Sequence, residues 1–372
     1  MAAILVFTGA ASSGILSAAA ATALHAASQQ RVLLLSVGAP GALGALLGAP
    51  AGFAPAEVAP GLDALAIDGL AEAAAAWERS RSRMPTGAAA VAGDELPIVP
   101  GAEMAFALAR LRELAPRYDL VVADAGPHDM LLRALALPDA LRWGVRLLFG
   151  LDRGPGKSND SIGRALLPTS LIPTDAYSGI QDARVGIESL RDMLLEPGAA
   201  AVRYVLRPDA PAFAEAQLAV PALQLHGLAV QAIVAGPLLP ASLAGTPLGG
   251  ALAAQDRLLE SARSAWPSRS FQRFELADGT GLGALRAQGA QLAAAPPGPA
   301  AAPIATVWQG APALAIALPG LPKGALQLTL SGDELIVRVG PYRRHLLLPD
   351  SLRGVANIRA TREGEHLVVR RR

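Results

Sequence analysis

The sequence contains no cysteine and only two lysines, Lys157 and Lys323, among its 372 residues. The lack of cysteine excludes disulfide bonds, thiolate metal sites and cysteine nucleophiles. Asparagine is equally scarce and occurs only as Asn159 and Asn357, while aromatic residues make up 4% of the chain. Because Lys+Arg nevertheless totals 32, the basic residues are almost all arginine.

Charge of either sign is also sparse, at 17% of residues, and the formal net charge is +1. Such a balance gives no general attraction to nucleic acid or to an anionic membrane. Residues 1–30 carry no Asp, Glu, Lys or Arg, yet they lack the basic start of a signal peptide. Thr8-Gly9 and Ser12-Ser13-Gly14 interrupt the apolar run that a spanning helix needs. We therefore expect a cytoplasmic protein that is not an integral membrane protein and has no nucleic-acid partner.

Short apolar runs alternate with alanine-rich helical patterns over most of the chain. Alternation of this kind is typical of right-handed βαβ crossovers and predicts an α/β fold with a doubly wound, mainly parallel sheet. The expected strands are residues 4–7, 31–37, 65–67, 97–99, 120–124, 202–206, 230–234 and 272–276. The expected helices between them are residues 17–28, 70–81, 102–114, 212–225 and 282–286.

The alternation is interrupted by a stretch with helical periodicity only, at residues 130–148 and 180–195. This stretch predicts a helical insertion at about residues 130–200, within a sheet domain of residues 1–290. Residues 291–303 are rich in proline and alanine and predict a stiff linker. Short apolar strands separated by turns then predict a small all-β sandwich at residues 304–372.

A turn rich in glycine and serine joins the first expected strand to the first helix, from Phe7 to Ser17. Doubly wound folds bind phosphate at such a turn, because the backbone amides at the helix start point toward the ligand. Asp124 ends a later strand, where it either caps the next segment or helps to place a metal. The candidate residues of a vestigial nucleotide- or anion-binding site are Gly9, Ser12, Ser13, Gly14, Ser17, Asp124 and Pro127. His128 follows them, and we expect it in an exposed loop rather than in a catalytic His-Asp pair.

The order of these segments resembles the ArsA-type ATPases, which include arsenical-pump ATPases and targeting ATPases for tail-anchored membrane proteins. The turn itself, "AAAATAL", "RVLLLS" and the switch-like "YDLVVADAGPHDMLLRALALP" carry the resemblance. The later "GDELIVRVGPYRRHLLLP" resembles the small-heat-shock-like domain of one branch of the family. The resemblance implies a P-loop NTPase fold with ATP and magnesium as cofactors, followed by a small-heat-shock-like domain.

The resemblance also implies where the family's functional groups would fall, and each position holds an unsuitable residue. The signature lysine falls on Ala10, the phosphate-binding lysine on Ile15 and the magnesium-binding hydroxyl on Leu16. The switch aspartate falls on Gly38, and the asparagine that reads adenine falls on Gly236. The scarcity of lysine and asparagine means that no shift of the alignment restores these groups.

Loss of these groups together predicts a protein that does not hydrolyse ATP, with no catalytic residue, no cofactor and no metal. The alternative is an active, ATP-binding ATPase with an unorthodox phosphate loop. The family's zinc-binding Cys-x-x-Cys pair cannot occur here, so any homodimer of this chain would have to form without zinc.

In the targeting branch, the helical insertion binds the apolar helix of a client protein. The resemblance therefore implies an interaction or chaperone-like protein whose partner is an apolar helical protein client. The groove candidates in this sequence are Leu135, Val145, Leu148, Phe149, Met193 and Leu194. In the other interpretation, these side chains pack on one another and on the sheet, as amphipathic helices commonly do.

Overall fold

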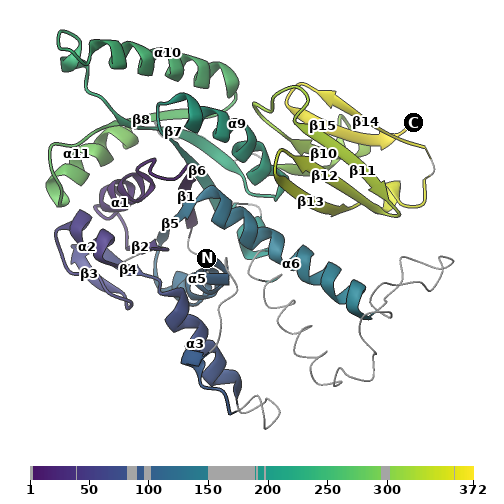
Figure 1. Ribbon diagram of the computed structural model, residues 1–372, viewed down its shortest axis with the longest axis horizontal. Helices are drawn as coiled ribbons and strands as arrows, with labels where there is room; N and C mark the ends of the chain where they lie inside the picture. The colour runs from purple at the N-terminus through teal and green to yellow at the C-terminus, as the bar shows by residue number, and fades with distance from the viewer. Residues whose placement is uncertain are drawn as a thin grey trace.

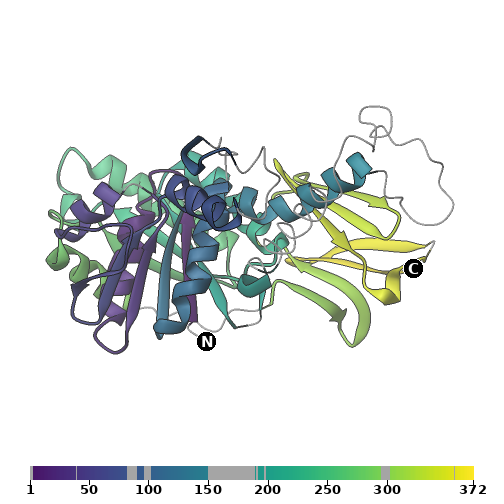
Figure 2. The same ribbon diagram turned by 90° about the horizontal axis from the view of Figure 1, so that it is seen from below.

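The computed structural model describes residues 3–38, 40–81, 90–95, 102–149, 189, 192–196, 198–294, 302–355 and 357–372. An α/β domain and a pair of smaller antiparallel sheets lie side by side, and one long helix reaches from the first to the second (Figures 1 and 2). Within the described residues, no helix is both long enough and apolar enough to cross a bilayer.

The α/β domain is built on a sheet of eight strands in the order β3-β4-β2-β5-β1-β6-β7-β8. Its strands are β1 Ala3–Gly9, β2 Val32–Ser36, β3 Ala56–Ala59, β4 Leu62–Ala66, β5 Leu120–Pro127, β6 Ala200–Leu206, β7 Val230–Leu238 and β8 Ser270–Glu275. All neighbours are parallel except β3 and β4, which are antiparallel. The predicted doubly wound, mainly parallel sheet is therefore confirmed.

Helices cover both faces of this sheet (Figure 1). They are α1 Ile15–Ala26, α2 Pro40–Leu47, α3 Gly69–Arg81, α5 Ala102–Leu114, α6 His128–Phe149, α9 Ala210–Leu225, α10 Gly249–Ala265 and α11 Leu282–Ala293. One core, under α1, α2 and α11, includes Phe7, Leu34 and Val234. The other, under α5, α6 and α9, includes Val6, Leu33 and Ile233. Adjacent residues of one strand thus enter opposite cores, which is why the strands are apolar throughout.

Alanine allows α1 to lie close to its neighbours. Ala18, Ala20 and Ala21 are fully buried. At the crossing of α1 and α11, a Cβ on Gly289 would lie 2.5 Å from the carbonyl oxygen of Ala21. The alanine-rich N-terminal segment is therefore a tightly packed core helix, because small side chains allow backbones to approach closely.

Several elements differ from the sequence-based expectation. The short antiparallel edge strand β3 was not predicted, because only Ala59 of its four residues is buried and no apolar run marks it. The helices α2 and α10 were also not predicted. The expected strand at residues 97–99 and most of the helix expected at residues 180–195 lie outside the described residues. The helix α11 extends through Ala293, three residues into the expected linker.

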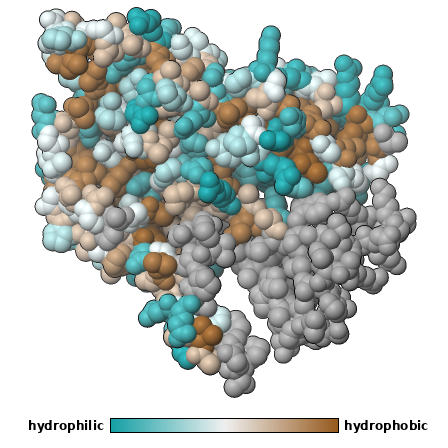
Figure 3. Space-filling view, in the orientation of Figure 1, coloured by the Kyte–Doolittle hydropathy of each residue, from teal (hydrophilic) through white to brown (hydrophobic). Residues whose placement is uncertain are grey.

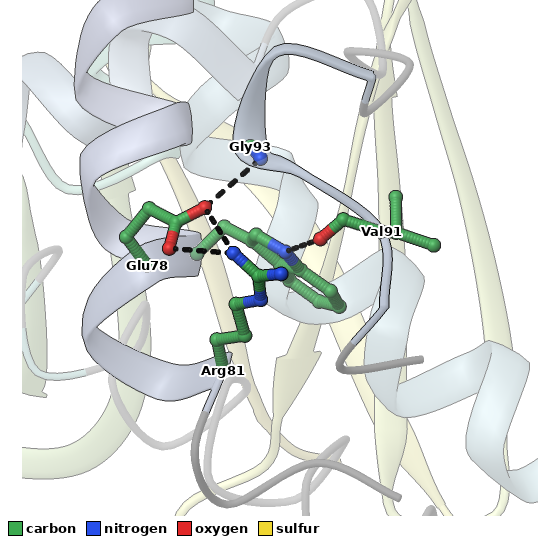
Figure 4. A network of polar contacts seen from close by, with 5 residues as sticks. Glu78, Arg81, Val91 and Gly93 are labelled. Atoms are coloured by element: carbon green, nitrogen blue, oxygen red, sulfur yellow. Dashed lines mark hydrogen bonds and ion pairs between the residues drawn. The ribbon is translucent and has the colours of Figure 1, made fainter. Parts of the chain in front are cut away.

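The end of α3 is tied to the segment that follows it by polar contacts (Figure 4). The Trp77 indole donates to the carbonyl of Val91 at 2.9 Å. Glu78 accepts from the Gly93 amide at 3.1 Å and from the Arg81 guanidinium at 3.2 Å. The guanidinium and the amide lower the pKa of the Glu78 carboxyl. These contacts fix residues 91–93 against α3.

The C-terminal residues form two antiparallel sheets, β14-β15-β10-β9 and β11-β12-β13. Their strands are β9 Ile304–Trp308, β10 Ala311–Ala317, β11 Leu326–Ser331, β12 Glu334–Val339, β13 Tyr342–Leu347, β14 Ile358–Glu363 and β15 His366–Arg371. Inward-facing side chains such as Ile316, Val337 and Val369 form their shared core. The predicted β-sandwich is therefore confirmed.

The sandwich packs against the end of α9. Leu225 of α9 belongs to the core of the sandwich, and its carbonyl accepts from the Arg344 guanidinium. The Trp266 indole, which follows α10, donates to the carbonyl of Pro319 at 3.3 Å. On the face shown in Figure 3, hydrophobic residues gather over both the α/β domain and the C-terminal sheets, with hydrophilic residues between them.

Candidate functional site

The turn between β1 and α1 is tight and braced by its own backbone. Ser12 and Gly14 adopt left-handed conformations, with φ of 60° and 73°. The Ser13 amide and hydroxyl both donate to the carbonyl of Ala10, at 3.2 and 2.7 Å. Gly9 is pressed against β6, where a Cβ would lie 2.2 Å from the carbonyl oxygen of Val205. The sequence therefore forms a compact turn that requires glycine at positions 9 and 14.

The two turn positions at which the resemblance implies lysine hold buried apolar side chains. Ala10 is 3% exposed and Ile15 is 7% exposed. Ile15 is part of the core under α1, and Leu16 packs against the same cluster. These side chains offer neither a cation for phosphate nor an oxygen for magnesium.

The hydroxyl groups at the turn are partly used within the fold. Thr8 Oγ1 donates to the carbonyl of Gly126 at 2.8 Å, and the Ser13 hydroxyl is engaged with Ala10. Ser12 is exposed at the tip, and Ser17 is partly exposed on the first turn of α1. Ser12, Ser17 and the turn amides are therefore the groups that could contact an anion from solvent.

Asp124 lies beside the turn at the end of β5, level with Phe7 of β1 and Ser36 of β2. Its Oδ2 accepts from the Ser36 hydroxyl at 2.8 Å and its Oδ1 from the Gly126 amide at 3.0 Å. Pro127 lies level with Gly9. Burial raises the pKa of the Asp124 carboxyl, against the lowering effect of the two hydrogen bonds. The predicted site residues thus gather at one edge of the sheet, with Asp124 bound to two donors of the chain.

Asp124→Asn is expected to stabilise the protein by about 1 kcal/mol at pH 7, because no charge is buried while the amide oxygen accepts from Gly126 and the amide nitrogen donates to the Ser36 hydroxyl. The raised pKa means that the folded state takes up a proton more readily than the unfolded state. Wild-type stability therefore falls as the pH rises from 3.8 through the folded pKa. The advantage of the Asn variant should vanish below the unfolded pKa, as measured by urea unfolding between pH 3.5 and 7.

Asp119→Asn is the matched control for this titration. Contacts with Arg31 lower the pKa of the exposed Asp119, so removing its charge is expected to destabilise the protein at neutral pH. An Asp124→Asn variant that is less stable than wild type at pH 7 would contradict the assignment of a costly buried carboxylate.

His128 is not in an exposed loop, as its position after Asp124 had suggested. It is the first residue of α6, is 6% exposed, and donates from Nδ1 to the carbonyl of Gly9 at 2.8 Å. The Tyr204 hydroxyl lies 3.3 Å from the same nitrogen, and the Tyr342 ring meets the imidazole edge-on at 6.2 Å between centroids. Burial lowers the pKa of His128. The imidazole therefore connects the first turn to the C-terminal sheets, a role that sequence spacing could not indicate.

The end of β7 packs against the turn between β1 and α1. A Cβ on Gly14 would lie 2.8 Å from Cδ of Pro237. Gly236 itself packs against Phe274 of β8, where a Cβ would lie 2.5 Å from the ring. A side chain at position 236, such as the family's asparagine, would collide with Phe274 in this arrangement.

The proposed groove residues fall into two groups. Leu135 and Leu194 are 1% and 2% exposed in the core of the α/β domain, and Met193 is partly buried against that core. Val145, Leu148 and Phe149 are on the last turns of α6, but their side chains lie outside the described part of the structure. In this structure Leu135 and Leu194 therefore face the core and line no open groove.

Comparison with known proteins confirms the resemblance. Residues 2–279 match the anion-transporting ATPase family of ArsA, and residues 309–370 match the HSP20-like domain found in ArsA. The chain is 36% identical to an uncharacterized protein of Streptomyces coelicolor, over 94% of this chain and 92% of the relative. It is 28% identical to a Mycobacterium tuberculosis protein, over 99% and 95%. A putative arsenical pump-driving ATPase of Prosthecochloris vibrioformis is 28% identical, over 64% and 62%.

These matches span both parts of the structure, the large parallel sheet with its glycine-containing first turn and the C-terminal antiparallel sheets. The chain belongs to the ArsA family of anion-transporting ATPases and carries the HSP20-like domain found in that family.

Proposed function

We propose that this protein is a non-hydrolysing member of the ArsA family, with a degenerate nucleotide site, that acts as an interaction or chaperone-like protein in the cytoplasm. The observation that carries the proposal is the packing of Ile15. The side chain at the expected phosphate-binding position is 7% exposed and belongs to a hydrophobic core.

Several further contacts support a site that does not fit ATP and magnesium. Phosphoryl transfer depends on positioning and on neutralising the developing charge. Ala10, Ile15 and Leu16 supply no such charge, and Asp124 is already engaged by Ser36 and Gly126. Phe274 occupies the space beside Gly236, where the family would place its adenine-reading side chain.

Isothermal titration of the full chain with Mg-ATP, combined with a phosphate-release assay, tests this proposal. We expect no micromolar binding and no phosphate release above the rate without protein. An active ATP-hydrolysing enzyme titrated in parallel controls for the nucleotide and metal stocks. Micromolar binding with phosphate release that Asp124→Ala removes would overturn the proposal.

The alternative is an active ATPase with an unorthodox phosphate loop, as the names of some relatives suggest. One contact favours this alternative, since the Arg207 guanidinium at the end of β6 donates to the carbonyl of Ala11 in the turn at 3.4 Å. Arg207 also pairs with Asp209, which holds it beside the turn. If the alternative holds, Arg207→Gln will remove ATP binding in the same titration.

A client-binding role for α6 is the finer part of the proposal. The helix reaches beyond the large sheet toward the C-terminal sheets, and its last turns carry Val145, Leu148 and Phe149 (Figure 1). We propose that this end binds an apolar helix of a protein client. In an aggregation assay with such a client, the double variant Leu148→Asp, Phe149→Asp should lose the protection that wild type gives.

Leu70→Asp is the matched control for the aggregation assay, because Leu70 is a leucine on α3 that is 66% exposed. This variant should protect the client as well as wild type does. Equal protection by the α6 double variant, or none by wild type, would contradict the chaperone-like role.

A further inference from the structure

One cavity of the α/β domain lies at the amino-terminal ends of the strands, at the opposite edge of the sheet from the first turn. It has a volume of about 680 Å³ and lies between the sheet and the helices α1 and α11. Its walls are formed mostly by small or apolar residues, including Ile4, Leu5, Ala201 and Leu292. Its volume is in the range of cavities that bind small organic molecules.

An arginine of β6 enters this apolar space. Arg203 follows Val202 and precedes Tyr204, both buried in the core on the other face, so its side chain faces α1 and α11. Its guanidinium carbon lies 5.7 Å from the centre of the Phe7 ring. The position in the middle of an apolar strand pattern is unusual, because charged residues are almost never buried there without a partner.

Arg203 has no counter-ion within the part of the chain that the structure describes. Its Nε is buried without a hydrogen-bond acceptor. The described residues lining the cavity include no Asp or Glu, and His25 is their other ionisable side chain. Burial lowers the pKa of Arg203 to about 10, so the guanidinium remains charged at neutral pH. The cavity therefore contains a half-buried cation, and no acidic side chain among the described residues neutralises it.

A second polar group of the same cavity is also unsatisfied. Thr22 lines it from α1, and its hydroxyl oxygen is buried without a partner among the described residues. A threonine within a helix commonly donates to a carbonyl of the preceding turn, which this one does not do. Gln272, on the β8 side, is held by a hydrogen bond from its Nε2 to the carbonyl of Leu292 at 2.7 Å.

We propose that this cavity binds a small organic carboxylate, whose carboxylate group pairs with Arg203 while its apolar body lies against the alanine and leucine side chains. A planar guanidinium matches a carboxylate with two parallel hydrogen bonds. One uncompensated arginine favours a monoanion, whereas a phosphate would require further donors. The site is separate from the first turn, and the proposal does not depend on whether the turn binds nucleotide.

Thermal unfolding and isothermal titration of the full chain test the proposal, with octanoate as the probe. Octanamide is the neutral molecule of matching shape, and inorganic phosphate is the anion without an apolar body. We expect saturating octanoate to raise the Tm by about 2–4 °C or more, and the other two compounds to leave it unchanged. Equal effects of octanoate and octanamide, or of octanoate and phosphate, would overturn the proposal.

Arg203→Met locates the site within the molecule. The variant should lose the response to octanoate, and its ligand-free Tm should exceed that of wild type, because a half-buried charge without a counter-ion is replaced by an apolar chain of similar size. Arg31→Gln is the control, since Arg31 lies at the same edge of the sheet but is exposed and paired with Asp119. It should respond to octanoate like wild type.

The comparison of octanoate with octanamide uses the unaltered protein, so the proposal can be overturned even if Arg203→Met does not fold. Ala201→Leu then provides a second test, because it narrows the cavity and keeps Arg203 in place. This variant should weaken octanoate binding at least tenfold. Retention of the full octanoate response in either variant would overturn the assignment of this cavity.

Discussion

Trp266→Ala is expected to lower the free energy of unfolding by about 3–5 kcal/mol, the typical cost of deleting a fully buried tryptophan side chain. Trp266 is 1% exposed and packs edge-to-face on Phe213 of α9, with 5.7 Å between ring centroids. Its indole donates to Pro319, and a Cβ on Gly320 would lie 2.4 Å from the indole nitrogen. The ring thus fills the junction of the α/β domain with the C-terminal sheets.

Urea unfolding followed by circular dichroism measures this loss, and limited proteolysis reports whether the two parts separate. Trp308→Ala is the control, because Trp308 of β9 is only partly buried and lies within the sandwich, where its indole donates to Glu363. The control should cost less and should not increase cleavage between the two parts. A Trp266→Ala protein as stable and as resistant to protease as wild type would show that the ring does not hold the junction.

Gly9→Ala is expected to destabilise the protein by on the order of 3 kcal/mol or more, or to prevent folding of the α/β domain. The new methyl group would lie 2.2 Å from the carbonyl oxygen of Val205 and 2.7 Å from the Ser13 hydroxyl. Since Val205 is on β6, which lies between β1 and β7 in the sheet, relief would require β6 to move away from β1. The His128 contact to the Gly9 carbonyl would be lost at the same time.

Thermal unfolding and soluble yield measure the effect of Gly9→Ala. Gly245→Ala is the matched control, because a Cβ there meets no atom within 4 Å and the residue does not have a positive φ. We expect this control to be as stable as wild type. If both variants were equally stable, β1 and β6 would not be in the close contact described here.

Much of the fold could be predicted from local patterns. The runs Ile4–Phe7 and Leu120–Ala123 are apolar because both faces of a central parallel strand are buried, and this requirement is visible in single segments. Likewise, the short apolar strands separated by turns after residue 304 are typical of a β-sandwich. Edge elements such as β3 carry no comparable signal, because only a small part of their surface is buried.

Composition alone established that the first turn has no lysine. The hydrogen bonds of Asp124, in contrast, depend on the fold. The residue types at positions 10 and 15, Ala10 and Ile15, are read directly from the sequence, so the lack of lysine there is known without the structure. The contacts of Asp124 with Ser36, of His128 with Gly9 and of Gly236 with Phe274 join residues between 38 and 119 positions apart. No local pattern encodes such pairs.

Arg203 shows most clearly the difference between what the sequence determines and what only the tertiary structure decides. In the sequence it is one arginine within an otherwise apolar strand, and its charge suggests an exposed position. Only the packing of α1 and α11 over β6 half-buries its side chain, because burial is decided by elements that are far away along the chain. The residue types thus determined which chemistry the first turn lacks, whereas the tertiary structure decided which charged groups became buried and which distant residues they meet.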